Sequence, residues 1–360
     1  MAVSFRDYLQ TLRKHDELVE ISKPVDLRNV AALVPQSEKA LLFTNVHGYS
    51  MPVVSGLLQS RNRLALGMGV SYGGIEEKLR SAMERPIKPR IVRKAPVKEV
   101  ILAGEKVDLY QLPVPIFSLM DGGPMITGAV VIAEDPEYGM NAGMYRLMLK
   151  EKNITGIDIV TPNNLRRYAE RALQAKKPLP ISIAIGAHPY EMMASTFKAS
   201  LGTNELGYAG GLRGEPLALA VGETIPVPCI ADAEIVLEGE ILPEGWIHPE
   251  GPFCEFYRLM GSLHYNPRQD QGHDAPAQAD LLRPAHAVGE YLDERADLRG
   301  GRVARLARGG GERDRHQCHA RRLLPLAHHR RDQETAGRGK ERDPGASLHR
   351  RHQARRRDRR

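Results

Sequence analysis

Two carboxylates near residue 250 have the types and spacing that acid and base chemistry requires. Glu250 and Glu255 are separated by the dipeptide Gly251-Pro252, which cannot continue a helix or a sheet ladder. Both side chains can therefore point into one cavity, where neighbouring carboxyls move each other's pKa apart and one can carry a proton near neutral pH. The alternative is a surface loop with two solvated acids.

A basic residue that could bind a carboxylate lies upstream of this pair. Arg146 ends the segment Asn141-Ala142-Gly143-Met144-Tyr145-Arg146, which follows a turn and heads a strand. Its guanidinium could hold a carboxylate through two hydrogen bonds. Asn141 and Arg146 lie on opposite faces of a regular strand unless Gly143 marks a bulge. The alternative is an arginine that pairs with any surface acid.

The elements that must position these residues fall into two segments, and the sequence predicts an α+β protein. Residues 1–105 read as a small α/β domain. Ser4 can cap a helix with Phe5, Tyr8, Leu9 and Leu12 on one face. Two short strands at 41–46 and 52–57 and a helix at 75–83 follow, and a proline-rich connector covers 95–115.

The second segment, residues 106–268, is rich in strands. Runs typical of β-structure occur at 126–133, 153–160, 181–186, 217–221 and 233–242. So many strands with so few helices favour a barrel or a wrapped sheet. One clear helix is predicted at 162–173, with Thr161 as its cap and Leu165, Tyr168 and Ala169 inward, and its amino end could hold a phosphate.

Composition indicates a soluble, cytoplasmic protein. The 360 residues contain no apolar run that could span a bilayer, and Met1–Asp7 lacks the features of a signal peptide. Cys229, Cys254 and Cys318 have neither metal nor disulfide spacing, so we expect reduced thiols.

The net charge of +7 is unevenly distributed, because two kinds of sequence meet at Arg268. Residues 269–360 hold 21 Arg and one Lys against 14 acids, while residues 1–268 are nearly neutral. All six Phe, all 12 Met and the single Trp precede residue 269.

This tail reads like a coding sequence translated in a shifted frame. When an arginine codon of the CGN type is read one base later, it begins with G and encodes Val, Ala, Asp, Glu or Gly. DNA that encodes an apolar core strand in one frame can therefore encode a run of arginines in another. We predict that residues 269–360 are a disordered product of a frameshift. The alternative is a basic arm that binds nucleic acid through salt-dependent phosphate contacts, although it has almost no aromatics to stack on bases.

The chain resembles the UbiD-type decarboxylases (3-octaprenyl-4-hydroxybenzoate carboxy-lyase-like), which use prenylated FMN. Five motifs occur in the order of that family: Asn141-Ala142-Gly143-Met144-Tyr145-Arg146, Ala194-Ser195-Thr196-Phe197, Asn204-Glu205 with Gly210-Gly211-Leu212-Arg213-Gly214-Glu215, Ala233-Glu234-Ile235-Val236-Leu237-Glu238-Gly239 and Pro249-Glu250-Gly251-Pro252-Phe253-Cys254-Glu255. The resemblance implies an amino-terminal α/β segment, a split β-barrel that holds the flavin, and a carboxy-terminal α/β domain that closes the site and forms homo-oligomers.

The resemblance also implies a reaction, the reversible decarboxylation of an aromatic or α,β-unsaturated acid. Arg146 would orient the substrate carboxylate and pair with Glu250, and Glu255 would donate the proton. The modified flavin, made by a flavin prenyltransferase, would be the electron sink. Because the third domain is lost from the present frame, we expect the 360-residue form to be inactive or nearly so.

Cofactor and metal ligands follow from the same resemblance. Mn2+ or a similar divalent ion would bridge the flavin phosphate to oxygens of Asn141 and Glu205. The family commonly supplies a histidine as third ligand, where this chain has Asn163-Asn164; Asn164 could ligate, or both could simply occupy a first helical turn. K+ would bind Ala194, Ser195 and Phe197. The residues implied to contact the flavin are Thr127, Asn141, Gly143, Met144, Arg146, Asn163 and Asn164.

Other features are interpreted as structural, and two other functions stay open. Cys254 is read as a small buried filler, His188 and His264 as hydrogen-bonding residues, and Gly210-Gly211 as a tight turn. The alternatives to a decarboxylase are a flavin reductase-type oxidoreductase on a split barrel and a nucleic-acid-binding protein that uses the basic tail. A set of Glu250, Glu255 and Arg146 argues against the former, because hydride transfer needs no such trio.

Overall fold

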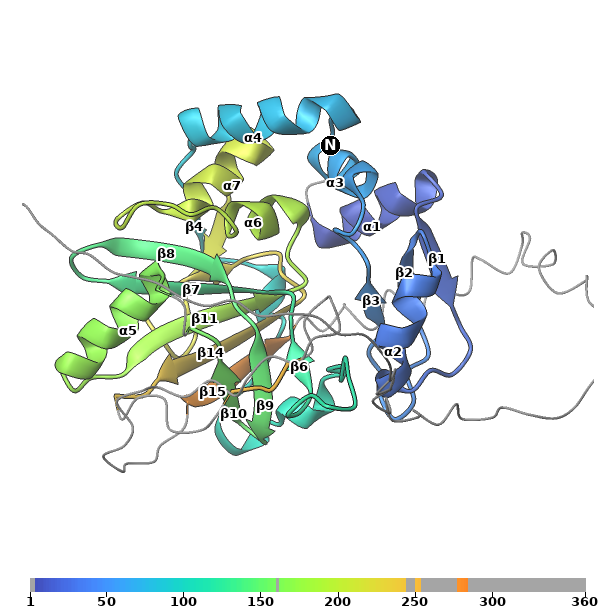
Figure 1. The fold of residues 1–360 in the computed structure, drawn as a ribbon. Coiled ribbons are helices and arrows are strands. Elements are labelled where there is room, and N and C mark those ends of the chain that lie inside the picture. Colours follow the sequence, from blue (N-terminus) through green and yellow to red (C-terminus); the bar gives the residue numbers. More distant parts are fainter. Residues whose placement is uncertain (1–3, 160–161, 244–249, 254–276, 284–360) are drawn as a thin grey trace, which may run out of the picture. The chain divides into compact units, whose positions relative to one another are not determined.

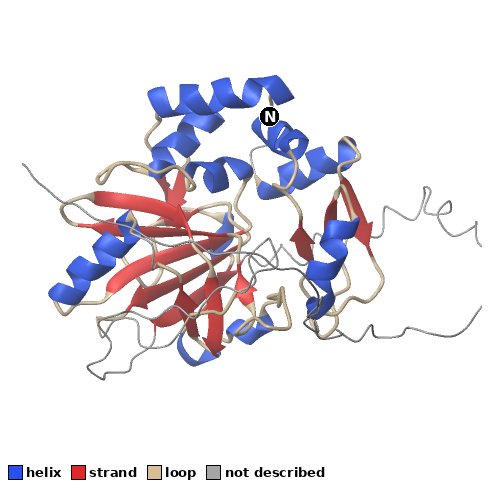
Figure 2. Ribbon diagram, in the orientation of Figure 1, coloured by secondary structure: helices blue, strands red, loops and turns tan. Residues whose placement is uncertain are grey.

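The structure is a computed structural model that describes residues 4–159, 162–243 and 250–253 and the backbone of a strand at 277–283 (Figure 1). These residues contain both helices and strands, as Figure 2 shows and as the sequence predicted. No helix in the described part of the chain is long and apolar enough to cross a membrane.

A small three-stranded sheet organises the amino-terminal part. β1 (Leu18–Ile21) is parallel to β2 (Ala40–Phe43), and β2 is antiparallel to β3 (Val53–Ser55). Every residue of β2 is buried, since alternate residues pack into separate apolar clusters on the two faces. The accompanying helices are α1 (Phe5–Lys14), α2 (Leu27–Leu33), α3 (Arg61–Met68) and α4 (Ile75–Glu84).

Helix α1 follows the prediction from its sequence. The Ser4 hydroxyl accepts a hydrogen bond from the Asp7 amide, and the Asp7 carboxylate accepts one from the Ser4 amide, so the two residues form a capping box. The apolar residues predicted on one face are all buried: Phe5, Tyr8, Leu9 and Leu12.

Most strands of the described residues belong to one nine-stranded sheet. Its order is β6-β9-β10-β15-β14-β11-β7-β8, with β5 paired to β15, and every pairing is antiparallel. The strands are β5 (Val100–Leu102), β6 (Met125–Ile126), β7 (Ala129–Asp135), β8 (Gly139–Met144), β9 (Leu147–Glu151), β10 (Ile154–Ile157), β11 (Leu179–Ile185), β14 (Ile235–Ile241) and β15 (Ala277–Arg283). They include the strands predicted near residues 130, 155, 183 and 238. The tail from residue 269 was predicted to be disordered, and this prediction is wrong for residues 277–283, because their backbone pairs with three strands as β15.

Both faces of this sheet are covered around β7. Val130 and Ile132 pack into a core with residues of α6 (Pro189–Ala194) and α7 (Glu205–Arg213). Val131 and Ala133 face the other way, into a core shared with α5 (Asn164–Gln174). Figure 1 shows α5 apart from α6 and α7. Residues 129–133 of β7 are all apolar because the side chains on both faces of this strand are buried in a core.

A third sheet joins distant parts of the sequence. β4 (Arg90–Val92) is parallel to β12 (Ala218–Ala220), and β12 is antiparallel to β13 (Cys229–Ile230). β5 likewise pairs with β15. Residues 90–102, which the sequence analysis placed at the end of the first domain, thus supply strands to much later partners.

Two further local predictions are wrong. Helix α5 begins at Asn164, not Pro162, because the Asn163 side chain accepts a hydrogen bond from the Arg166 amide and is the actual cap; Thr161 lies outside the described residues. Gly210 and Gly211 lie inside α7 and form no turn. They allow close packing, since a Cβ on Gly211 would stand 2.8 Å from the Ala82 carbonyl oxygen of α4.

Candidate functional site

Arg146 is held between two carboxylates in the described structure. Its Nε lies 3.1 Å from both carboxylate oxygens of Glu250, and its Nη2 lies 2.7 Å from Glu250 Oε2. Its Nη1 lies 2.9 Å from Asp158 Oδ2. The Phe253 ring is 5.1 Å from the guanidinium carbon, within range of a cation–π contact. The predicted pairing of Arg146 with Glu250 is present in the structure.

The strand ends determine where Arg146 points. β8 stops at Met144, so Arg146 lies in the two-residue connection to β9. The ladder between β7 and β8 runs without a register shift, and Gly143 therefore forms no bulge. A Cβ on Gly143 would instead collide with the Tyr145 ring. The Asp158 amide donates to the Arg146 carbonyl oxygen at 3.2 Å, which ties the two residues together through the backbone as well.

Glu250 reaches Arg146 through a closely packed turn. Gly251 has a φ of 92°, which favours glycine, and its carbonyl oxygen lies where a side chain on Gly122 would be. The Gly122 amide donates to the Pro252 carbonyl oxygen at 2.9 Å. Two backbone segments thereby fix Glu250, which is almost completely buried.

The second carboxylate of the predicted pair cannot be placed. Glu255 and Cys254 lie outside the described residues, as do Pro249 and His264. The geometric relation between Glu250 and Glu255 therefore stays a prediction.

A separate polar cluster surrounds Glu205, the first residue of α7. Asn141 Nδ2 donates to Glu205 Oε1 at 2.8 Å, and the Ala142 amide donates to Glu205 Oε2 at 2.9 Å. Burial raises the pKa of Glu205, while the hydrogen bonds from Ala142, Asn141 and Asn164 oppose that rise. Asn141 Oδ1 and Ser195 Oγ are buried and have no hydrogen-bond partner within the described residues. Asn141 Oδ1 is a buried oxygen without a donor, on a side chain that contacts the Glu205 carboxylate, and such an oxygen suits a cation.

The remaining predicted ligands divide between this cluster and helix ends. Asn164 joins the cluster through Glu205 and also donates to the Ala199 carbonyl oxygen at 3.2 Å. Asn163 instead caps α5 and accepts a hydrogen bond from the Tyr145 hydroxyl at 3.2 Å. The described residues contain no group of three or more His, Cys, Asp and Glu side chains that could hold a metal.

The residues predicted to bind K+ lie at the end of α6. Ala194 is its last residue, and Ser195 is its cap. The Ser195 carbonyl oxygen accepts from the Met144 amide at 3.3 Å, which brings this turn to the end of β8. The Phe197 ring packs edge-on against Tyr208 of α7, with centroids 5.6 Å apart.

Sequence reasoning missed Asp158 and Lys150. Asp158 is the one acid between Glu151 and Glu170 and follows the apolar end of β10, a signal that its charge has a buried partner. Lys150 and Glu250 both pack on Gly156, where a Cβ would lie 3.5 Å from Lys150 Cε and 3.1 Å from Glu250 Cγ. Burial lowers the pKa of Lys150, and the charge of Glu250 opposes that shift.

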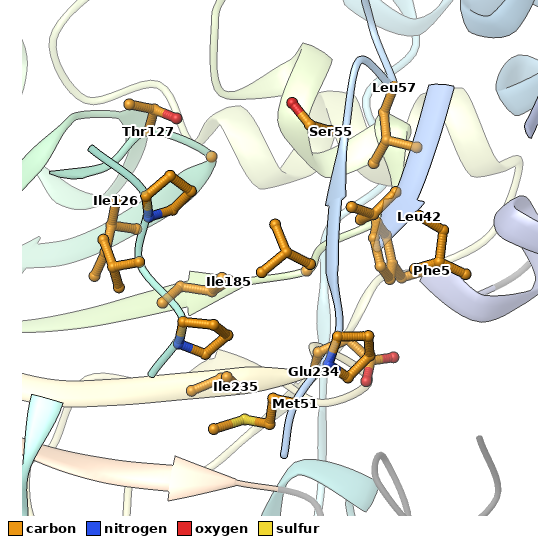
Figure 3. Close-up of a pocket in the computed structure, with 18 of the residues that line it drawn as sticks. Phe5, Leu42, Met51, Ser55, Leu57, Ile126, Thr127, Ile185, Glu234 and Ile235 are labelled. Atoms are coloured by element: carbon orange, nitrogen blue, oxygen red, sulfur yellow. The ribbon is translucent and has the colours of Figure 1, made fainter. Parts of the chain in front are cut away.

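An apolar pocket of about 400 Å³ lies between β3, β6 and the ends of β11 and β14. Figure 3 shows Ser55 and Leu57 on one side and Thr127, Ile126 and Ile185 on the other. The charged residues of its lining, Arg6 and Glu234, pair with each other at 2.9 Å. Thr127, which was predicted to contact the flavin, lines this pocket. It directly follows β6, whose Ile126 pairs with Leu147 of β9, the residue after Arg146.

Two family models match the chain and agree with this arrangement. The 3-octaprenyl-4-hydroxybenzoate carboxy-lyase N-terminal domain matches residues 9–83, and the Rift-related domain of the same enzyme, UbiD, matches residues 90–269. The protein belongs to the UbiD family.

Individual relatives are decarboxylases. The chain is 33% identical to anhydromevalonate phosphate decarboxylase of Methanosarcina mazei over 239 residues, which is 66% of this chain and 54% of that protein. It is 32% identical to pyrrole-2-carboxylic acid decarboxylase of Pseudomonas aeruginosa over 260 residues, which is 66% of this chain and 52% of that protein. The chain therefore spans about half the length of these curated relatives.

Solved structures show the same fold. The UbiD-class enzyme HmfF from Pelotomaculum thermopropionicum in complex with FMN aligns with a TM-score of 0.72 and 38% identity, over 78% of this chain and 63% of that one. An evolved dimeric form of HmfF in complex with prFMN aligns with a TM-score of 0.71 and 39% identity, over 78% of this chain and 65% of that one.

Proposed function

We propose that the protein is a carboxy-lyase for an aromatic or α,β-unsaturated carboxylic acid and uses prenylated FMN. The observation that carries the proposal is the half-buried Arg146, which is aligned by Glu250 and Asp158. A fixed guanidinium binds and orients a carboxylate better than a mobile one, because less rotational freedom is lost on binding. The decarboxylases among its relatives support the same reaction.

The cluster around Glu205 fits the ion that would hold a flavin phosphate. Asn141 Oδ1 and the Glu205 carboxylate are hard oxygen donors, and the first has no other partner in the described part of the chain. Asn164 would complete the set for Mn2+ or a similar ion. Ala194, Ser195 and Phe197 would provide oxygens for K+ beside Glu205. When bound, the modified flavin would accept the electron pair left by departing CO2.

The side chains of this protein then have distinct tasks. Arg146 would hold the acid by its carboxylate, and Glu250 would keep the guanidinium in place. After the carbon–carbon bond to CO2 breaks, the carbon needs one proton, which Glu255 would donate; in carboxylation the same residue would remove it. Water exclusion by Phe253 and the turn at 250–253 would strengthen these charge interactions.

The architecture of the intact enzyme is part of the proposal. Short connections join β6 to β7 and β8 to β9, so they link the two ends of the path from β6 to β8, which favours a split barrel. A third domain that closes the site, a homo-oligomer and a flavin prenyltransferase that supplies the cofactor complete the system.

A binding experiment tests the role of Arg146 in the chain as it stands. Benzoate is titrated into the wild-type protein and into Arg146→Gln, with Arg171→Gln as a control that removes an ion-paired arginine on α5. Loss of a charge-assisted contact should weaken benzoate binding by roughly tenfold or more. Equal affinities for the wild type and Arg146→Gln would refute the proposed carboxylate site.

The proton-donor role requires a form with an intact third domain. In that form, Glu255→Gln should abolish CO2 release while flavin absorbance of the purified protein is retained. Continued decarboxylation by Glu255→Gln would exclude Glu255 as the donor. Flavin-dependent oxidation of a nicotinamide cofactor without CO2 release would favour the flavin reductase alternative.

A further inference from the structure

The guanidinium of Arg146 is already occupied on two sides. Glu250 takes the edge formed by Nε and Nη2, and Asp158 takes Nη1. A carboxylate that arrives from outside must therefore share or replace one of these contacts.

The two acids are not equally replaceable. Glu250 contacts two nitrogens, its side chain is 5% exposed, and its backbone is fixed by the turn that packs on Gly122. The Asp158 side chain is 20% exposed. Asp158 is therefore the acid that solvent, and a ligand from solvent, reaches more easily.

Asp158 also contributes to the charge balance of the described residues around Arg146. Arg146 and Lys150 carry two positive charges, and Glu250 and Asp158 carry two negative charges. Exchange of one carboxylate for another at Arg146 leaves this sum unchanged, so the exchange avoids the large cost of an uncompensated charge in a partly buried site.

From these contacts, and on the basis of the proposed function, we propose that Asp158 is an internal ligand that occupies the place of the substrate carboxylate at Nη1 of Arg146. An acid substrate binds by displacing the Asp158 side chain, which turns toward solvent. Asp158 thereby selects for anionic ligands, since an uncharged analogue cannot replace it without leaving Arg146 undercompensated. Asp158 is a specificity-determining residue and takes no part in bond breaking.

The proposal predicts a gain of affinity when Asp158 is changed. In the wild type, apparent affinity is reduced by the fraction of molecules in which Asp158 holds Arg146. Asp158→Asn and Asp158→Ala should therefore lower the dissociation constant of benzoate, by about fivefold if the paired state accounts for four fifths of the molecules. The affinity for benzamide, which has the same ring and no charge, should not rise. Titration calorimetry on the full chain measures both.

Matched variants separate this role from a structural one. Asp135→Asn removes another acid that pairs with an arginine, Arg171, and should leave benzoate affinity unchanged. In an Arg146→Gln background, Asp158→Asn should have no effect, because the shared partner is gone. If Asp158 merely held Arg146 in place, its removal would weaken benzoate binding.

Each outcome decides between the two proposals. Unchanged or weaker benzoate binding by the Asp158 variants, together with weaker binding by Arg146→Gln, overturns the internal ligand and leaves the proposed function standing. No effect of Arg146→Gln overturns the carboxylate site itself. If Asp158→Asn does not fold, Asp158→Ala in the same titration gives the decision.

Discussion

His188 is a buried titratable residue outside the proposed chemistry. Its Nδ1 accepts a hydrogen bond from the Tyr190 amide at 3.2 Å and so caps α6, while its Nε2 has no partner among the described residues. Burial, with the charge of Arg213 added, lowers its pKa to about 3. Because the folded-state pKa lies below that of the unfolded chain, this residue contributes stability that is complete above pH 6.5 and is lost as the pH falls toward 3.

The variant His188→Asn should therefore flatten the pH dependence of stability. Asparagine retains an acceptor for the Tyr190 amide but takes up no proton on unfolding. Between pH 6.5 and 4, the free energy of unfolding of the wild type should fall more steeply than that of the variant, by up to about 1.4 kcal/mol per pH unit. Urea unfolding at several pH values measures the difference. The exposed His47, changed to Asn, is the control; parallel curves for His188→Asn and the wild type would contradict the prediction.

At the residue scale, the sequence predicted residue pairs within the family motifs, but it missed contacts with residues outside those motifs. The family resemblance implied that Arg146 pairs with Glu250 and that Asn141 and Glu205 bind one metal ion, and the structure brings the members of each pair together. Asp158 was not predicted as a site residue. Its contact with Arg146 forms because the hairpin of β9 and β10 returns the chain to Arg146, and no local sequence pattern predicts that geometry. Asn163 was expected to contact the flavin. In the structure its side chain caps α5, a role for which asparagine is also well suited.

At the element scale, α7 shows why a helix rich in glycine was read as a turn. Its glycines lower helix propensity, yet they let the helix approach its neighbours closely. A Cβ on Gly210 would collide with the Ile87 carbonyl oxygen, whereas a Cβ on Gly207 would lie 3.4 Å from Pro86 Cβ, an ordinary contact. Tertiary packing therefore overrides propensity in α7, while in α1 capping and periodicity agree with the fold.

This difference gives a matched pair of alanine substitutions. Gly210→Ala should destabilise the protein by about 1–3 kcal/mol, because the backbone at Ile87 must move. Gly207→Ala should be neutral or stabilise it by up to about 1 kcal/mol through helix propensity. The midpoints of urea unfolding of the two variants test the argument. Equal midpoints would mean that α7 is not packed as closely as the structure indicates.

At the scale of the whole molecule, the sequence changes character where the family match ends. The UbiD model stops matching at residue 269, and the arginine-rich composition begins at the same point. The helices and strands of residues 1–268 could be predicted, because this part of the sequence contains periodic apolar patterns, helix caps and ordered motifs. Residues 269–360 were predicted to be disordered from their composition, yet residues 277–283 form β15, which pairs with β5, β10 and β14. Arginine content alone therefore did not reveal this strand, whose partners lie far away in the sequence.

Resequencing the coding DNA across the codons of Arg268 and Gln269 tests the frameshift. We expect a lost or gained base there, after which the corrected frame encodes an ordinary α/β domain. A confirmed frame would instead require the tail to be explained by its own charge. In that case salt-dependent binding of nucleic acid, lost on deletion of residues 269–360, would be the first property to measure.

The pairing of β4 with β12 has a consequence for the newly made chain. Arg90–Val92 leave the ribosome long before Ala218–Ala220 exist, and at roughly 5–20 residues per second the interval is on the order of ten seconds. During that time β4 and β5 are strands without their own partners, and such strands pair readily with other chains. Slow translation of the stretch between them and their partners should therefore increase aggregation of nascent chains rather than assist their folding.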